Sequence, residues 1–205
     1  MNLENETDIL IWHIDESLEK LHKSLTLPKT EDQRLMKKKS LSHKKQFLAS
    51  RNLLLQAGIS LSSLSYDLNG APQLESGQQL SISHSEAIAG IAIGNKPLGF
   101  DLEAYRPKIL NIASHFLNTE EGFALKGTRS IEKLTLIWTA KEALYKALKQ
   151  KGIIFSKQLL VAPFQWEDHH GSAKVFFSDN TLDFSLNFII EKDYCAALAT
   201  QKNKI

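Results

Sequence analysis

The sequence predicts an α+β fold made of two similar lobes, each a long helix packed on a small, mainly antiparallel sheet. Apolar residues recur at helical spacing in residues 31–57 and again in residues 134–149, and strand-like segments accompany both helices. Residues 51–57 also align with residues 141–147 without a gap. Together these observations indicate a duplication, in which the two lobes are related by a pseudo-twofold axis.

The predicted boundary gives an N-terminal lobe at residues 1–97 and a C-terminal lobe at residues 98–205, which carries the acidic motifs described below. Each lobe contains a strand of small residues, AIAGIAIG in the first and YCAALAT in the second. Any two amphipathic helices can be aligned to some degree. The shared order of elements is therefore the stronger sign of duplication.

Local patterns predict the individual elements. A capping box formed by Asn118 and Glu121 predicts a helix that starts near Thr119. The pair Asn69-Gly70 predicts a tight turn. Apolar or alternating segments predict strands at residues 8–14, 81–83, 87–93, 98–102, 184–190 and 194–199.

Composition excludes several classes of protein. The 25 basic and 23 acidic residues leave a formal net charge of +2, too small to indicate a nucleic-acid binder. No stretch approaches the roughly 18 apolar residues of a membrane span, and the acidic first dozen residues do not resemble a secretory signal. The single cysteine, Cys195, excludes an internal disulfide. We expect a cytoplasmic protein that binds neither nucleic acid nor a membrane.

Five lysines lie between Lys37 and Lys45 with no acidic residue among them. Such a cluster is typical of a solvated helix face, and it also suits a local phosphate-binding patch. The lysine pattern alone leaves both interpretations open.

Asp101 and Glu103 lie two residues apart on a predicted strand, so their side chains point to the same face. Strands are depleted in acidic residues, and two adjacent carboxylates repel each other unless a cation lies between them. Carboxylate oxygens are ligands that Mg²⁺ prefers. The pair is either a magnesium site or two exposed acids at the end of a strand.

A second charged group lies on the predicted helix at residues 134–149. Glu142 and Lys146 are four residues apart, which is the favourable order for a helical ion pair, and Trp138 shares their face. This pattern is compatible with a surface salt bridge. It is equally compatible with a third metal-binding carboxylate, or a proton acceptor, beside a lysine that binds phosphate.

Ser83 and His84 are adjacent on a predicted strand, so their side chains point apart. No G-x-S-x-G motif accompanies them, and a hydrolase is not favoured. By itself His84 is compatible with a structural role.

In their order along the chain, these motifs resemble the 4′-phosphopantetheinyl transferase superfamily. LGFDLE at residues 98–103 is similar to the family strand G-(I/V/F)-D-(I/L/V)-E, and WTAKEALYK at residues 138–146 is similar to its helix W-(S/T)-x-K-E-A-x-x-K. LSISHS at residues 80–85 and FLNTEE at residues 116–121 are supporting matches. The resemblance extends over the whole chain and is to the longer, surfactin-synthetase-activating (Sfp-like) type, which implies a monomer.

The resemblance implies an enzyme that transfers 4′-phosphopantetheine from coenzyme A to a serine hydroxyl of an acyl or peptidyl carrier protein and releases 3′,5′-ADP. It implies that Asp101, Glu103 and Glu142 hold Mg²⁺ against the pyrophosphate of coenzyme A. Lys146 would face the same diphosphate and protonate the leaving phosphate. Glu142 would also accept the proton of the serine, directly or through a metal-bound water.

The resemblance also assigns residues to coenzyme A. It implies that Ser83 and His84 contact the phosphates of the nucleotide end, with His84 near the 3′-phosphate. Arg51, on the first long helix, matches an arginine that many relatives carry and is a further expected phosphate contact.

One segment departs from the family pattern. Many relatives have G-K-P before the S-H strand, whereas residues 70–72 read GAP here. We expect weaker coenzyme A binding, or compensation by Lys44 or Lys45.

The missing lysine is the only support for a non-catalytic module that binds coenzyme A or a carrier protein. A nucleic-acid binder built on residues 37–45 would leave the acidic motifs without a role.

Overall fold

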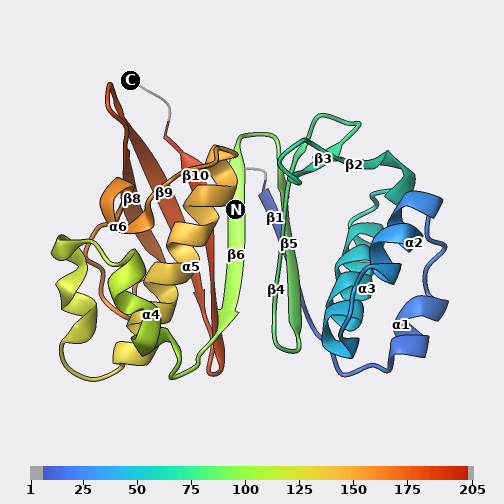
Figure 1. Ribbon diagram of the computed structural model, residues 1–205, viewed down its shortest axis with the longest axis horizontal. Coiled ribbons are helices and arrows are strands. Elements are labelled where there is room, and N and C mark those ends of the chain that lie inside the picture. Colours follow the sequence, from blue (N-terminus) through green and yellow to red (C-terminus); the bar gives the residue numbers. More distant parts are fainter. Residues whose placement is uncertain (1–6, 203–205) are drawn as a thin grey trace, which may run out of the picture. The chain divides into compact units, whose positions relative to one another are not determined.

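The computed structural model describes residues 7–202 and divides the chain into two units, Met1–Asn95 and Lys96–Ile205. Each unit combines antiparallel sheets with helices (Figure 1). The predicted α+β fold class is therefore confirmed, and the duplication stays a prediction. Within residues 7–202, no helix has the length and apolar character to cross a bilayer.

The first unit contains a three-stranded antiparallel sheet in the order β1-β5-β4. The middle strand is buried along its whole length, because helix α3 packs on it. A small ribbon of β2 and β3 is closed at the predicted Asn69-Gly70 turn, where Gly70 has a φ of 85°. The elements are β1 (Thr7–His13), α1 (Leu18–Lys23), α2 (Lys29–Met36), α3 (Leu41–Gln56), η1 (Leu61–Ser63), β2 (Leu64–Tyr66), β3 (Pro72–Leu74), β4 (Gln79–Ser85) and β5 (Ile88–Gly94).

The predicted long helix at residues 31–57 is wrong as a continuous element. The structure has two helices there, α2 and α3, separated by residues 37–40. The break has a local cause: Ser40 adopts an extended backbone, and its side chain accepts a hydrogen bond from the His43 amide at 3.1 Å. Ser40 therefore caps a new helix, as serine often does.

The second unit contains a five-stranded antiparallel sheet in the order β6-β10-β9-β8-β7. Helix α5 lies along β6 and β10, as Figure 1 shows. The elements are β6 (Leu98–Ala104), α4 (Ile109–Phe116), η2 (Thr119–Leu125), α5 (Ser130–Leu148), α6 (Phe155–Gln158), β7 (Leu159–Val161), β8 (His170–Phe176), β9 (Thr181–Ile190) and β10 (Tyr194–Gln201).

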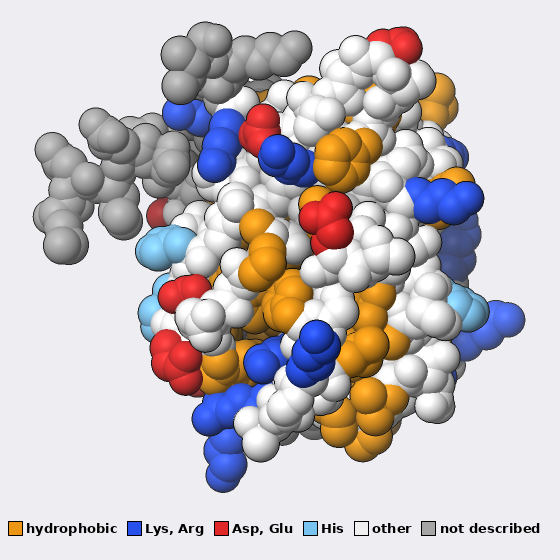
Figure 2. Space-filling view, turned by 90° about the vertical axis from the view of Figure 1, so that its left-hand side faces the viewer, with side chains coloured by type: hydrophobic (Ala, Val, Ile, Leu, Met, Phe, Trp, Pro, Cys, Tyr) orange, Lys and Arg blue, Asp and Glu red, His pale blue; other side chains and the backbone are white. Residues whose placement is uncertain are grey.

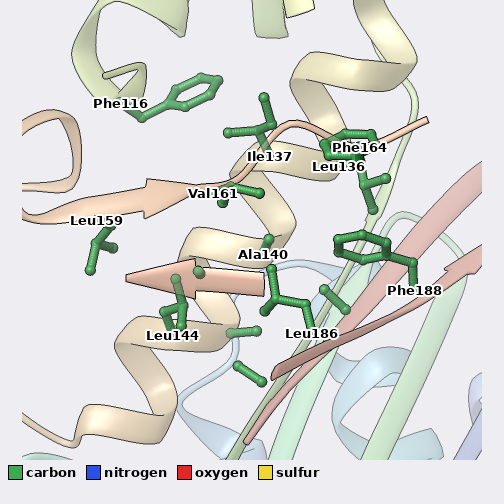
Figure 3. Close-up of a cluster of buried hydrophobic side chains, with 14 of the residues drawn as sticks. Phe116, Leu136, Ile137, Ala140, Leu144, Leu159, Val161, Phe164, Leu186 and Phe188 are labelled. Carbon is green, nitrogen blue, oxygen red and sulfur yellow. The ribbon is translucent and has the colours of Figure 1, made fainter. Parts of the chain in front are cut away.

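The core of the second unit lies between α5 and its sheet. Ile137, Ala140 and Leu144 of α5 are fully buried and belong to one cluster with Val161 and Leu186 (Figure 3). The predicted capping box is confirmed, although the helix that it starts, η2, is of the 3-10 type. Apolar burial on this face holds α5 against the sheet to which β6 belongs and so positions the polar residues that α5 and β6 carry.

The surface is mixed in character. Figure 2 shows one face, on which hydrophobic side chains gather in the centre with lysine and arginine side chains beside them. Among residues 96–202 the exposed large hydrophobic residues are Leu110, Leu125 and Ile154.

Candidate active site

The close approach of β6 and α5 is set by Gly99. A Cβ atom added to Gly99 would lie 1.9 Å from the Ala143 carbonyl oxygen and 2.5 Å from the Ala147 amide nitrogen. Alternate residues of a strand share a face, so Asp101 and Glu103 point to the α5 side as Gly99 does. The glycine of the LGFDLE motif thus allows two carboxylates to lie against the helix that carries Glu142 and Lys146.

Lys146 pairs with Asp101 across this contact. Its Nζ atom lies 2.7 Å from Asp101 Oδ1 and donates a second hydrogen bond to the Phe100 carbonyl oxygen at 3.0 Å. Within residues 96–202, no ion pair joins Lys146 to Glu142, so the helical salt bridge that their spacing suggested is not formed. The lysine instead neutralises a buried carboxylate of the neighbouring strand, which is 4% exposed.

Glu142 lies on α5 close enough to the β6 acids to be affected by their charges. Burial is the main cause that raises its pKa to about 7, and the negative charges of Asp101 and Glu103 raise it further, while Lys146 lowers it. The β6–α5 contact therefore gathers three carboxylates and one ammonium group. A carboxyl group with a pKa near neutrality is suited to accepting a proton at physiological pH.

The donor types fit a magnesium ion. Three carboxylates supply the hard oxygen ligands that Mg²⁺ prefers, and a cation would relieve the repulsion that raises the pKa of Glu142. Among residues 7–202, however, no three His, Cys, Asp or Glu side chains lie in a metal-holding arrangement. Lys146 supplies the positive charge next to Asp101 in this state. A magnesium site formed by Asp101, Glu103 and Glu142 is therefore a proposal.

A pocket of about 250 Å³ begins beside Glu103 in the second unit. Thr135 and Trp138 of α5 form one wall, on the helical stripe that continues to Glu142. The remaining lining residues come from the end of β6 and from α4 and the segment before it: Ala104, Arg106, Lys108, Ile109 and Ile112. Four of the eight lining residues are apolar and three are charged.

Comparison with known families matches a family model of the 4′-phosphopantetheinyl transferase superfamily to residues 97–199. The chain belongs to this superfamily. No curated protein matches the chain. The matched range contains the β6 and α5 motifs, and membership supports a transferase role in phosphopantetheine transfer.

The predicted coenzyme A residues of this superfamily member lie in the first unit. On β4, Ser83 is buried and pairs with Gly90, whereas His84 is exposed. Lys44 is half-buried on the first turn of α3. The strand turns Ser83 and His84 to opposite faces, so the two side chains do not share one direction.

Arg51 does not present its guanidinium group to solvent. It is 4% exposed and pairs with the buried Glu31 at 2.7 Å, donates to Ser50 and Tyr66, and lies 3.6 Å above the Phe47 ring. These contacts occupy three of the five N–H donors of the guanidinium group. In this structure Arg51 is buried in the first unit, and its contact with a coenzyme A phosphate stays a prediction.

Arg51→Met is expected to lower the free energy of unfolding by about 3–5 kcal/mol, because it leaves the carboxylate of Glu31 buried without its main partner. Urea unfolding followed by the fluorescence of Trp12, in the first unit, measures the loss. Arg34→Met is the matched control, since the Arg34 side chain is 42% exposed and lies 3.8 Å from the same carboxylate. Equal losses in the two variants would contradict the structural role of Arg51.

Glu142→Gln is expected to stabilise the metal-free protein at pH 8. The folded state keeps a proton on Glu142 up to a pKa of about 7, whereas the unfolded chain releases it near 4.5. Stability therefore falls as the pH rises through this window, and the glutamine variant avoids about 1–3 kcal/mol of this loss after allowance for partial exposure.

Urea unfolding at pH 4.5 and pH 8 measures this difference. Glu167→Gln, at an exposed glutamate of the same unit, is the control. A Glu142→Gln effect that is the same at both pH values would show that the pKa of Glu142 is not raised.

The motifs gave no functional role to two charged residues that the structure places in the interior of the second unit. Lys141 and Glu121 are both fully buried and form an ion pair of 2.7 Å. A signal for Lys141 was present in the sequence, because Ile137 and Leu144 fall on the same helical face and mark it as buried. A lysine at such a position requires an acidic partner. The sequence did not show which acid it is.

Proposed function

We propose that this chain transfers 4′-phosphopantetheine from coenzyme A to a serine hydroxyl of an acyl or peptidyl carrier protein, with release of 3′,5′-ADP and dependence on Mg²⁺. The observation that carries the proposal is the meeting of Asp101 and Glu103 on β6 with Glu142 and Lys146 on α5. This meeting lies within the range that the family model matches. We further propose the longer, surfactin-synthetase-activating type and a monomer in the cytoplasm.

In this proposal Asp101, Glu103 and Glu142 hold the magnesium ion, which supplies positive charge against the pyrophosphate when bound. Lys146 would lie within reach of a phosphate oxygen, where its ammonium group would stabilise the charge that develops on the leaving oxygen. The 2.7 Å contact of Lys146 with Asp101 supports this role, because it brings the ammonium group next to one of the proposed metal ligands.

The bonding change is a substitution at phosphorus. The serine oxygen forms a bond to the β-phosphorus of coenzyme A, and the bond from that phosphorus to the bridging oxygen breaks. Glu142 accepts the serine proton, a role supported by its position beside the β6 acids. Lys146 donates to the departing phosphate of 3′,5′-ADP.

The coenzyme A phosphates are proposed to be bound in the first unit by Ser83, His84 and the lysines of α3. Ala71 stands where many relatives have a lysine, and Lys44 and Lys45 are the proposed replacements. Their positions near the start of α3 support this, because two half-buried lysine side chains place positive charge there that can attract an anion.

The deciding experiment incubates the protein with coenzyme A, Mg²⁺ and apo-carrier proteins of the fatty-acid, polyketide and peptide-synthetase types. Mass spectrometry detects the modified carrier serine, and chromatography detects 3′,5′-ADP. Modification of at least one carrier, abolished by chelation of Mg²⁺, is expected. Tight binding of coenzyme A without transfer to any carrier would favour the non-catalytic module instead.

A further inference from the structure

Lys141 is held by three acceptors in the interior of the second unit. Its Nζ atom lies 2.7 Å from Glu121 Oε2, 2.6 Å from the Phe116 carbonyl oxygen and 3.2 Å from the Phe155 carbonyl oxygen. An ammonium group has three N–H donors, so these contacts account for all of them. The side chain is fully buried and has one well-defined position.

Glu121 is equally constrained. Besides Lys141, its Oε2 atom accepts a hydrogen bond from the Asn118 amide at 2.7 Å, and its Oε1 atom accepts one from the Val161 amide at 2.8 Å. The pair therefore joins α5 to the end of α4, the start of η2, the start of α6 and the end of β7. Five elements are connected by two side chains.

Such a pair is a poor source of stability. Removing two charges from water costs so much that a well-packed apolar pair of similar volume is often as stable or more so. What a fully satisfied buried pair does supply is a single geometry, since any shift or rotation of α5 would break several charge-assisted hydrogen bonds at once.

The Lys141–Glu121 ion pair selects the geometry of the proposed active site. Lys141 directly precedes Glu142, and Lys146 follows five residues later on the same rigid helix. Each residue turns an α-helix by about 100° and advances it by about 1.5 Å, so fixing Lys141 fixes the direction of the next turn. On the opposite side of α5, the Nζ atom of Lys146 lies 2.7 Å from Asp101 Oδ1.

The ion pair of Lys141 and Glu121 also orders a group of aromatic side chains. The rings of Phe116 and Phe155, whose carbonyl groups bind Lys141, lie 5.2 Å and 5.6 Å from the ring of Trp138. Trp138 lines the pocket beside Glu103. One buried ion pair thus constrains both the charged groups and the pocket next to them.

We propose that Lys141 and Glu121 are positioning residues, whose buried ion pair sets the rotation of α5 so that Glu142 and Lys146 face Asp101 and Glu103. This inference rests on the proposed function. It assigns a role to two residues that need not touch coenzyme A or the carrier.

The test compares Lys141→Met, Glu121→Gln and the double variant with the wild-type chain and with Lys126→Met, which removes an exposed lysine of the same unit. Each single change leaves a buried group without its charged partner, and both are expected to lower the midpoint of urea unfolding. The double variant is expected to regain most of that midpoint, because methionine fills the space and glutamine still accepts from the Val161 amide.

Measurements of kcat and KM distinguish a positioning role from a role in stability alone. In the double variant we expect kcat to remain about 10–100-fold below that of the wild type, with KM for coenzyme A within about twofold, as for a small misplacement of reacting groups. Lys126→Met is expected to match the wild type in both. A double variant that regains its unfolding midpoint together with a kcat within about threefold of the wild type would overturn the inference.

If the double variant does not fold, the Glu121→Gln variant tests the inference alone, because Lys141 still donates to the carbonyl oxygens of Phe116 and Phe155 in it. A folded Glu121→Gln chain with the wild-type kcat overturns the inference, and a loss of about tenfold or more in kcat at an unchanged KM supports it. A wild-type chain that modifies no carrier overturns the proposed function and this inference together. An active wild type with unaffected variants overturns the inference alone.

Discussion

Asp101→Asn is expected to lower kcat for phosphopantetheine transfer by about 10²–10³-fold, the cost of removing one electrostatic group aimed at the reacting centre. The change is nearly isosteric, so the β6 backbone and its pairing with β10 remain. It removes a negative charge from the proposed metal site and from the ion pair in which Lys146 Nζ lies 2.7 Å from Asp101 Oδ1. Both losses act on the same step, the displacement at the pyrophosphate.

The measurement is the initial rate of carrier modification at limiting and at saturating Mg²⁺, together with the unfolding midpoint. Asp179→Asn, at an exposed aspartate of the same unit, serves as the control and is expected to match the wild type. The unfolding midpoint of Asp101→Asn is expected to change little, because Lys146 is 28% exposed and keeps its hydrogen bond to the Phe100 carbonyl oxygen. Near wild-type transfer by Asp101→Asn at limiting Mg²⁺ would rule out its assignment.

Gly99→Ala is expected to destabilise the second unit by at least about 3 kcal/mol, at the upper end of the cost of overpacking, because the atoms in its way belong to backbone that cannot rotate aside. The new Cβ atom would lie 1.9 Å from the Ala143 carbonyl oxygen. To accept it, α5 must move away from β6, which also separates Glu142 and Lys146 from the β6 acids.

Gly122→Ala provides a matched control, since an added Cβ atom there meets nothing within 4 Å. Urea unfolding followed by the fluorescence of Trp138 and Trp166, both in the second unit, measures the two variants. Transfer activity of any folded Gly99→Ala protein is expected to fall as well. Equal stability of the two alanine variants would show that β6 and α5 do not approach as closely as described.

Much of the fold could be predicted from the sequence because its signals are local. The strand at residues 87–93, the Asn69-Gly70 turn and the Asn118–Glu121 capping box were each predicted from neighbouring residues and are present with small shifts of boundary. The predicted helix at residues 31–57 was wrong for a local reason as well. Helical periodicity continued through Ser40, although that residue caps a new helix.

The candidate site was predictable in part. The residue types and spacing of the β6 and α5 motifs pointed to one group of acids and a lysine, and the structure brings Asp101 and Lys146 together. Two contacts of the charged residues were not predicted. Arg51, expected at a phosphate, binds the buried Glu31, and Lys146 pairs with Asp101 instead of Glu142.

The sequence by itself determined the family, the α+β class and the acidic and basic residues from which a site can be built, because motifs and periodicity are properties of short segments. Only the tertiary structure decided which charges meet. Glu121 and Lys141 are 20 residues apart, and Asp101 and Lys146 are 45 apart. Partners at such separations are selected by how α5 packs on η2 and on β6, contacts that depend on shape and burial summed over the whole unit.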